Sequence, residues 1–82
     1  MLKEEVWLEG KKVVKYSLAY VNRRLCFVDN GRVLGYDNGH AHHHRHFMGK
    51  VEAIKFPGYQ ALATRFQREV EELWRLENEQ ED

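Results

Sequence analysis

The stretch VVKYSLAYVNRRLCFVDNGRVLGY, residues 13–36, decides the fold of this 82-residue chain. Residues 13–21 and 25–28 are rich in β-branched and aromatic side chains, which favour β-strands. Asn30-Gly31 lies between two apolar runs, and this dipeptide is the strongest short-range signal of a two-residue hairpin turn. We therefore expect antiparallel strands joined by tight turns at Asn22-Arg23 and at Asn30-Gly31, the latter with positive φ.

Both turns place the same side chains on one sheet face. A turn at Asn30-Gly31 pairs Phe27 with Leu34, and a turn at Asn22-Arg23 pairs Leu18 with Phe27. Successive residues of a strand point to opposite faces, so two correct pairings must place the same side chains on one face. The two pairings meet this requirement. This face, which we expect to form the core, holds Val14, Tyr16, Leu18, Tyr20, Leu25, Phe27, Leu34 and Tyr36.

The rest of the chain adds strands on both sides of this segment and then a helix. A short first strand is expected over residues 4–9 and a later one over residues 50–56. After Pro57-Gly58, apolar residues at helical spacing predict a helix of about twenty residues that covers the aromatic sheet face. Its apolar positions are Tyr59, Leu62, Ala63, Phe66, Val70, Leu73 and Trp74.

The expected fold class is α+β, an antiparallel β-meander sheet of four to five strands packed by one long C-terminal α-helix. Residues 1–76 form a single domain, because no linker divides them. Residues 77–82 are acidic and lack apolar side chains, which predicts a disordered tail. The other sheet face carries small or apolar residues, a surface that we expect a homodimer to cover. Its members are Ser17, Ala19, Val21, Arg24, Cys26, Val28, Val33 and Gly35.

Charge is distributed unevenly along the chain, although the formal net charge is +0. Residues 10–68 carry eleven Lys and Arg side chains against three acids, whereas residues 69–82 carry one Arg against seven acids. A basic body favours a polyanionic partner, and RNA is our candidate. The single cysteine excludes an internal disulfide, and no apolar run suits a signal peptide or a membrane span. We expect a cytoplasmic protein with no membrane partner.

Histidine is concentrated in one short segment that follows Tyr36-Asp37-Asn38. Its five members are His40, His42, His43, His44 and His46. In an extended segment, alternation places the even-numbered histidines along one edge, and His43 with Arg45 along the other. Imidazole titrates at about pH 6.5, so neighbouring histidines supply a proton acceptor and a proton donor near neutrality. Arg45, together with Arg23 or Arg24, is expected to hold a phosphate.

Three chemistries remain open for this segment. The first is metal-independent cleavage of RNA with no cofactor, for which the expected catalytic residues are His42, His43, His44, His46 and Arg45. The substrate-binding residues would then be Arg23, Arg24, Tyr36, Asp37, Asn38 and Lys50. The second is a metal-binding regulatory domain built on the histidine row. The third is a non-catalytic module that binds protein or nucleic acid. Asp37 and Asn38 also fit ordinary turn chemistry, and Tyr36 also fits a core position.

A resemblance to a known family rests on Val33-Leu34-Gly35-Tyr36-Asp37-Asn38, the histidine-rich stretch to His46, Val51-Glu52 and the final amphipathic helix. Over residues 13–76 the chain resembles the TumE family. Those proteins are toxins of bacterial and archaeal toxin–antitoxin modules, usually encoded beside a helix-turn-helix antitoxin. Many members place an Arg where this chain has Gly35. The resemblance implies a growth-inhibiting toxin with a cognate antitoxin as its partner, and the basic body directs that expectation toward RNA.

Overall fold

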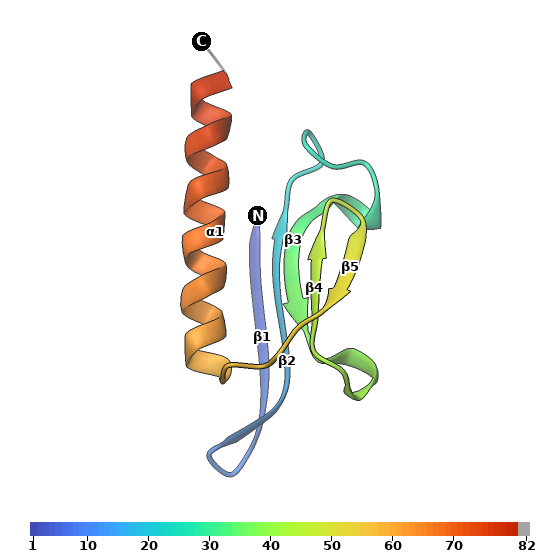
Figure 1. The fold of residues 1–82 in the computed structure, drawn as a ribbon, viewed down its shortest axis with the longest axis vertical. Helices are drawn as coiled ribbons and strands as arrows, with labels where there is room; N and C mark the ends of the chain where they lie inside the picture. The colour runs from blue at the N-terminus through green and yellow to red at the C-terminus, as the bar shows by residue number, and fades with distance from the viewer. Residues whose placement is uncertain (81–82) are drawn as a thin grey trace.

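The computed structural model describes residues 1–80 and consists of a five-stranded antiparallel sheet with one long helix against it (Figure 1). The strands follow one another across the sheet in the order β1-β2-β3-β4-β5, an up-and-down meander. The elements are β1 (Leu2–Glu9), β2 (Lys12–Val21), β3 (Arg32–Asp37), β4 (His44–Phe47), β5 (Lys50–Ala53) and α1 (Tyr59–Gln80). The predicted α+β architecture is confirmed. Compared with the prediction, β1 begins earlier and β5 ends earlier.

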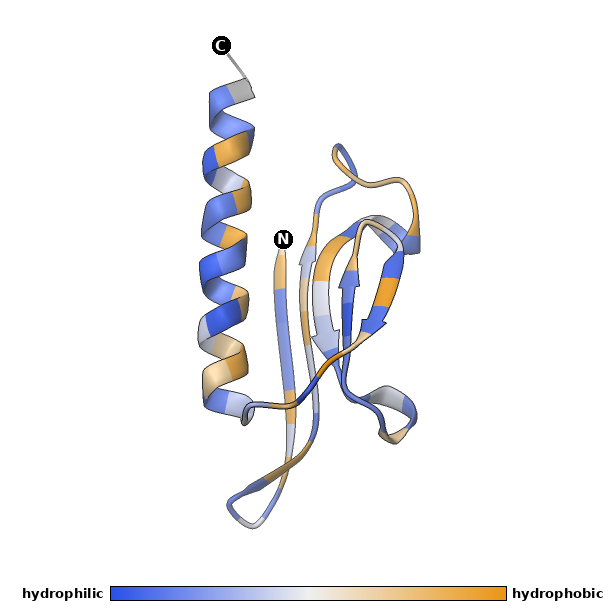
Figure 2. Cartoon of the chain, in the orientation of Figure 1, coloured by the Kyte–Doolittle hydropathy of each residue, from blue (hydrophilic) through white to orange (hydrophobic). Residues whose placement is uncertain are grey.

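The core lies between α1 and one face of the central strands. Apolar positions of α1 recur on the side that faces the sheet (Figure 2). Tyr36 and Phe66 meet edge to face across this interface, with ring centroids 6.2 Å apart. The buried side chains that β2, β3 and α1 contribute to this interface are Tyr16, Leu18, Tyr20, Leu34, Tyr36, Leu62, Phe66 and Val70. The helical stripe predicted from the sequence therefore covers the predicted aromatic face.

The pairing of β2 with β3 differs from the prediction. Leu18 pairs directly with Tyr36, and residues 22–31 form a long loop instead of a further strand between two tight turns. Most of the predicted core face is still right, because side chains alternate between the two faces along each strand, whichever strand pairs with it. Phe27 is wrong, since it is 91% exposed in the loop. Val14 is also exposed, at a bulge in β2.

Polar contacts of Asn22 explain why the chain leaves the sheet at that point. The backbone N–H of Asn22 donates to the carbonyl of Gly31 at 2.8 Å and closes the loop, while its own carbonyl accepts two further loop N–H groups. The side-chain oxygen of Asn22 accepts the N–H of Arg24 at 3.0 Å. Asn30 has the predicted positive φ, at 56°, but within a 3₁₀ turn over Asp29–Gly31. Side-chain hydrogen bonding by an asparagine thus outweighed local strand propensity.

The sheet face opposite α1 is covered in part by the loop of residues 22–31. Cys26, which the loop contributes, is 2% exposed, and Val33 of β3 is equally well buried. The loop reaches as far as the β4–β5 turn, where a Cβ on Gly49 would meet Val28 at 2.6 Å. Residues 22–31 therefore cover part of the small-residue surface that the sequence offered to a homodimer, and Arg32 lies over Gly35.

α1 continues into the segment that was expected to be a disordered tail. Residues 77–80 are helical, and residues 81–82 lie outside the described part of the chain. The cause is Glu77, whose carboxylate accepts a hydrogen bond from the Tyr20 hydroxyl at 2.8 Å and another from Asn22 Nδ2 at 3.0 Å. These bonds hold the last turns of α1 against the end of β2. Within residues 1–80, no helix combines the length and apolar character that crossing a membrane requires.

Candidate functional site

Strand alternation divides the predicted site between the two faces of the sheet. In the antiparallel pairing of β3 with β4, Asp37 pairs with His44 on the face away from α1, and Tyr36 pairs with Arg45 on the face that α1 covers. His46, two residues after His44, returns to the face of Asp37. Two of the predicted catalytic histidines therefore share a surface with Asp37, whereas the predicted catalytic arginine lies behind them.

Five side chains on the face away from α1 form a polar group that we name the Asp37 cluster: Asp29, Arg32, Asp37, His44 and His46. His46 Nε2 lies 2.7 Å from Asp37 Oδ2, and Arg32 Nη2 lies 3.0 Å from His46 Nδ1. Asp29 Oδ2 holds Arg32 Nε at 2.7 Å, and His44 Nδ1 lies 3.8 Å from Asp37 Oδ1. All five side chains are partly exposed, so a solute in water can reach them.

The contacts of His46 define which of its nitrogens carries a proton. A guanidinium group has N–H donors and no acceptor, so His46 Nδ1 must be the acceptor of the bond from Arg32. The ring proton is then on Nε2, which donates to Asp37 Oδ2. In the tautomer that satisfies both contacts, Asp37 orients the ring of His46 and Arg32 covers its Nδ1. If Arg32 turned toward an anion, the lone pair of Nδ1 would become free to accept a proton.

Gly35 makes room for this arrangement. A Cβ at position 35 would lie 2.7 Å from Arg32 Cδ and 3.1 Å from the carbonyl oxygen of Leu18. Both separations are shorter than Cβ atoms ordinarily show, so a side chain at position 35 would displace Arg32 from its place across β3 beside His46. Gly35 therefore contributes to the site by leaving the space that the Arg32 side chain occupies.

Asp37 and Asn38 have different roles. Asn38 Oδ1 accepts the backbone N–H of Tyr16 at 3.0 Å, and Asn38 Nδ2 donates to the carbonyl of Val14 at 3.0 Å. This side chain therefore ties the end of β3 to the bulge in β2, and its polar atoms are occupied by the fold. Asp37 Oδ1 accepts the backbone N–H of Gly39 at 3.0 Å, which leaves Oδ2 for His46. Both residues take part in turn chemistry, but only Asp37 also faces the histidines.

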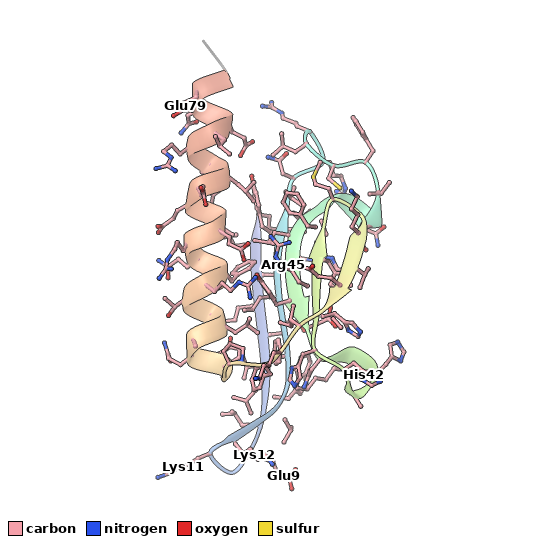
Figure 3. All side chains as sticks on the ribbon, in the orientation of Figure 1. Glu9, Lys11, Lys12, His42, Arg45 and Glu79 are labelled. Atoms are coloured by element: carbon pink, nitrogen blue, oxygen red, sulfur yellow. The ribbon has the colours of Figure 1, made fainter. Side chains whose placement is uncertain are left out.

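Arg45 belongs to a separate ion-pair group between the sheet and α1 (Figure 3). Its Nη2 lies 2.6 Å from Glu69 Oε2, its Nη1 lies 3.4 Å from Glu52 Oε1, and its Nε donates to the Tyr36 hydroxyl at 3.1 Å. Burial lowers the pKa of Arg45, but hydrogen bonds to Glu69 and Tyr36 outweigh this and raise it overall. Burial, followed by the bond to Glu69, raises the pKa of Tyr36 to about 12. Two carboxylates compensate the charge of Arg45, and Lys50 lines a shallow pocket beside it, away from the Asp37 cluster.

His43 is packed on the same side of the sheet as the core. Its ring stacks on Phe56 with centroids 4.1 Å apart, and its Nδ1 lies 2.8 Å from the Tyr16 hydroxyl. Burial, with a smaller contribution from the charge of Asp37, raises the pKa of Tyr16 to about 12. The phenol therefore keeps its proton, and its hydroxyl shares a hydrogen bond with His43 Nδ1. His43 is a structural side chain in this arrangement and does not join the row formed by His44 and His46.

The remaining predicted residues are spread along the molecule. The exposed ring of His42 lies 6.1 Å from that of His44 and extends the histidine row, whereas His40 lies in the 3₁₀ turn Gly39–Ala41. Arg23 and Arg24 lie in the loop at the other end of the sheet from this turn, so they are not brought to the histidines (Figure 1). Within residues 1–80, no three His, Cys, Asp or Glu side chains are grouped so as to hold a metal ion.

Sequence reasoning missed Asp29 and Arg32, which complete the Asp37 cluster. Both come before β3 or at its start, well ahead of the histidines in sequence, and only the pairing of β3 with β4 brings them together. Their spacing could have predicted the ion pair, because an acidic and a basic residue three positions apart on either side of a turn lie close enough to interact. Arg32 and Asp29 do so, with 2.7 Å between Nε and Oδ2.

Comparison with known proteins bears on this geometry. A family model described as Toxin TumE matches residues 2–74 of the 82-residue chain. The matched range contains all five strands, most of α1 and every member of the Asp37 cluster. No curated protein and no solved structure gives a significant match.

Proposed function

Because the chain belongs to the TumE toxin family and is therefore the toxin component of a toxin–antitoxin module, we propose that it arrests growth by cleaving RNA without a metal ion. In this reaction a ribose 2′-oxygen attacks the adjacent phosphorus, and the bond from phosphorus to the 5′-oxygen breaks. The products are a 2′,3′-cyclic phosphate and a free 5′-hydroxyl. The reaction needs a proton acceptor, a proton donor and a cation at the phosphate.

The observation that carries this proposal is the chain of contacts from Arg32 through His46 to Asp37. His46 is the proposed base, because Asp37 fixes its Nε2–H and leaves Nδ1 as the acceptor. In the free protein Arg32 covers that nitrogen. A phosphate that binds Arg32 draws the guanidinium away from Nδ1, so arrival of the substrate would uncover the base at the moment it is needed.

His44 is the proposed acid. Its ring centroid lies 6.2 Å from that of His46 on the same strand, so one phosphate lying over both rings can reach each of them. In its protonated form His44 gives a proton to the departing 5′-oxygen, while Asp37 Oδ1, 3.8 Å from Nδ1, keeps the ring in place. The 2′-hydroxyl proton ends on His46 and the proton of His44 ends on the 5′-oxygen, so the exchange is balanced. His42, exposed at the end of the row, extends the surface along which RNA would lie.

Affinity for RNA would come from the basic body of the chain. Residues 10–68 carry eleven Lys and Arg side chains against three acids, and such a surface binds the phosphate backbone in a salt-dependent way. The acidic end of α1 would stay away from the RNA. We further propose that the cognate antitoxin is of the helix-turn-helix type and that both proteins act in the cytoplasm. An antitoxin gene of that type adjoining this one would support the assignment.

The test is cleavage of a defined RNA by the purified chain in the presence of EDTA. Cleavage should persist with the chelator, end in a cyclic phosphate and depend on pH as a bell centred between about 6 and 7.5. His46→Ala and His44→Ala should each abolish cleavage and growth arrest with an unchanged circular dichroism spectrum. His40→Asn is the matched control, since His40 lies outside the cluster and asparagine tolerates its positive φ.

Three results would contradict the proposal. Full toxicity of His44→Ala and His46→Ala would remove the Asp37 cluster from the mechanism. Loss of toxicity in these variants, in a protein that never cuts RNA, would instead make the cluster a binding surface of a non-catalytic module. Loss of activity with EDTA and its return with zinc would favour metal chemistry.

A further inference from the structure

β1 is an exposed sheet edge with a free row of backbone groups. Every residue of Leu2–Glu9 is exposed. At its start, the backbone N–H of Val21 donates to the carbonyl of Met1 at 2.8 Å, and the amino group of Met1 donates back to Val21 at 2.8 Å. Backbone groups alternate in direction along an antiparallel strand, so the even-numbered residues turn theirs outward. These are Leu2, Glu4, Val6 and Leu8.

The outer edge of β1 carries charged side chains, which discourage unspecific pairing, but it has neither a bulge nor a proline to prevent a specific one. The irregularity between β1 and β2 lies in β2, because Trp7 pairs with Lys15 and Leu8 pairs with Val13, which leaves Val14 as the extra residue. β1 itself therefore remains regular, and it contains no proline. A regular edge of this length, without a bulge or a proline, is a template for another strand.

We infer that β1 pairs antiparallel with β1 of a second copy of this chain, about a two-fold axis at Val6. In this register Val6 faces its own counterpart, and Lys3 of each copy faces Glu9 of the other, so the same ion pair forms twice. Lys3 and Glu9 turn their backbone groups toward β2, so across the new strand pair they would form a non-hydrogen-bonded pair. Side chains of such pairs lie closer together than those of hydrogen-bonded pairs. Moving the axis to Glu5 or to Glu4 would instead place two identical carboxylates against each other.

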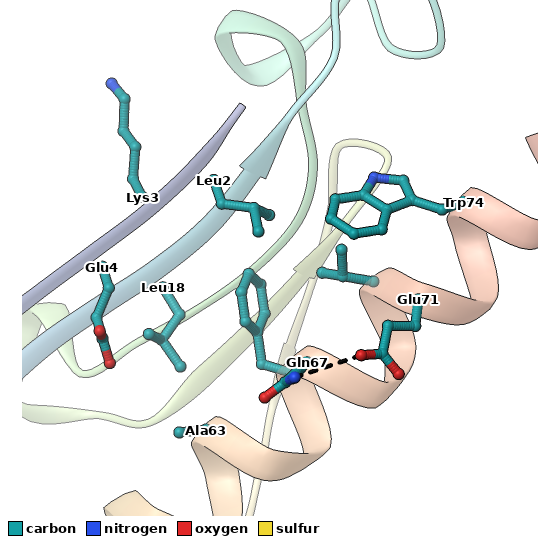
Figure 4. Close-up of a pocket in the computed structure, with 10 residues that line it drawn as sticks. Leu2, Lys3, Glu4, Leu18, Ala63, Gln67, Glu71 and Trp74 are labelled. Carbon is teal, nitrogen blue, oxygen red and sulfur yellow. Dashed lines mark hydrogen bonds between the residues drawn. The ribbon is translucent and has the colours of Figure 1, made fainter.

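A groove beside β1 favours the same register. The groove, of about 370 Å³, lies between β1 and α1, and its apolar lining includes Leu2, Phe66 and Trp74 (Figure 4). Glu4 is on its margin. With the axis at Val6, Leu8 of the second copy stands opposite Glu4 and on the same face of the joined sheet. Leu8 is 62% exposed in the single chain, and pairing would bring it to this apolar groove.

Self-complementarity is what singles out a second copy as the occupant. A two-fold interface requires that one patch match itself, and a strand with a cation at one end, an anion at the other and a valine in the middle meets that requirement. Neither Lys3 nor Glu9 has a salt-bridge partner within residues 1–80, so both are available. The inference does not depend on RNA cleavage.

Light scattering of the purified full chain, combined with a charge exchange, tests this dimer. The wild-type chain should show twice its mass of 9.8 kDa. Lys3→Glu and Glu9→Lys each turn two attractive pairs into repulsive ones, and each should weaken dimerisation roughly tenfold. The combined variant restores both pairs and should return to wild-type affinity. Val6→Pro removes an outward N–H without breaking a bond to β2 and should also give monomers.

The controls separate this surface from others. Val51→Lys, on the exposed strand β5 at the other edge, should leave the dimer unchanged. Thermal melts of all variants show whether they fold. A wild-type monomer at the highest attainable concentration overturns the inference, and so does a dimer that both single charge variants leave intact. Protection of the β1 amides from hydrogen exchange by the antitoxin, in a chain that is monomeric alone, would assign the edge to that partner instead.

Discussion

Replacing Gly35 by Ala tests whether the position of Arg32 governs the candidate site. The new Cβ would lie 2.7 Å from Arg32 Cδ and 3.1 Å from the carbonyl oxygen of Leu18. Carbon atoms make favourable contact at about 3.5–4.0 Å, so Arg32 must move by roughly 1 Å at Cδ and by more at its guanidinium. A displacement of that size breaks the 3.0 Å contact between Arg32 and His46. The contact with Leu18 requires a smaller adjustment of the backbone.

The structure predicts unequal effects on stability and on activity. An added methyl group in a packed site costs about 1–3 kcal/mol of unfolding free energy, and the lower end applies because the partly exposed Arg32 side chain can swing into water. Each 1 kcal/mol lowers the Tm of a domain this small by about 4–8 °C. Loss of a preorganised group at a reacting oxyanion lowers the rate by about 10²–10³-fold. The Gly35→Ala protein should therefore have a slightly lower Tm and a much lower rate of RNA cleavage.

The assay compares initial rates of RNA cleavage well below the Tm of every variant. Arg32→Ala is the necessary companion, because both changes act through the same contact. The double variant Gly35→Ala/Arg32→Ala should then cleave no more slowly than Arg32→Ala alone, which is the non-additivity expected of coupled residues. A folded Gly35→Ala protein that cleaves at the wild-type rate would refute the role given to Arg32.

Two further predictions concern the core and the tyrosines. Leu34→Ala should destabilise the chain by about 2–5 kcal/mol, because Leu34 is 0% exposed. Phe27→Ala, at a side chain 91% exposed, should change stability by less than about 0.5 kcal/mol in the same denaturation experiment, and a large loss there would favour the hairpin predicted from the sequence. The pKa of every tyrosine is raised, and those of Tyr16 and Tyr36 are about 12. The folded protein should therefore show little phenolate absorbance at about pH 10, where unperturbed tyrosines ionise. Stability should fall as the pH rises from about 10 to 12, because the unfolded state releases these protons first, and tyrosines that ionise at pH 10 in a folded chain would contradict this.

Local patterns in the sequence were sufficient for the α+β class, although they predicted a strand over residues 25–28 and did not assign β4. Alternation along residues 13–21 and 33–36 identified the core face, since the side-chain period of a strand is a property of the strand itself. The apolar stripe after Pro57-Gly58 likewise identified the helix and the side that it buries. The loop at residues 22–31 was not predictable in this way, because its strand-like composition is outweighed by contacts of Asn22 with Gly31 and with Glu77, which is 55 residues away.

The candidate site divides along the same line. The histidine-rich segment stood out from composition alone, and alternation correctly separated His44 and His46 from His43 and Arg45. Alternation does not show which residue of another element each side chain contacts. Arg45 looked like a phosphate ligand until the fold placed Glu69 of α1 2.6 Å from its guanidinium.

By itself, therefore, the sequence determined the α+β class, the buried face of β2 and β3 and the segment rich in proton-transfer groups. These properties depend on intervals of a few residues, over which backbone geometry is nearly constant. Only the tertiary structure decided that Arg32 lies over Gly35 and contacts His46. It also decided that Arg45 forms an ion pair with Glu69 of α1. Such contacts join positions that are distant along the chain, and their formation depends on the free energy of the whole fold.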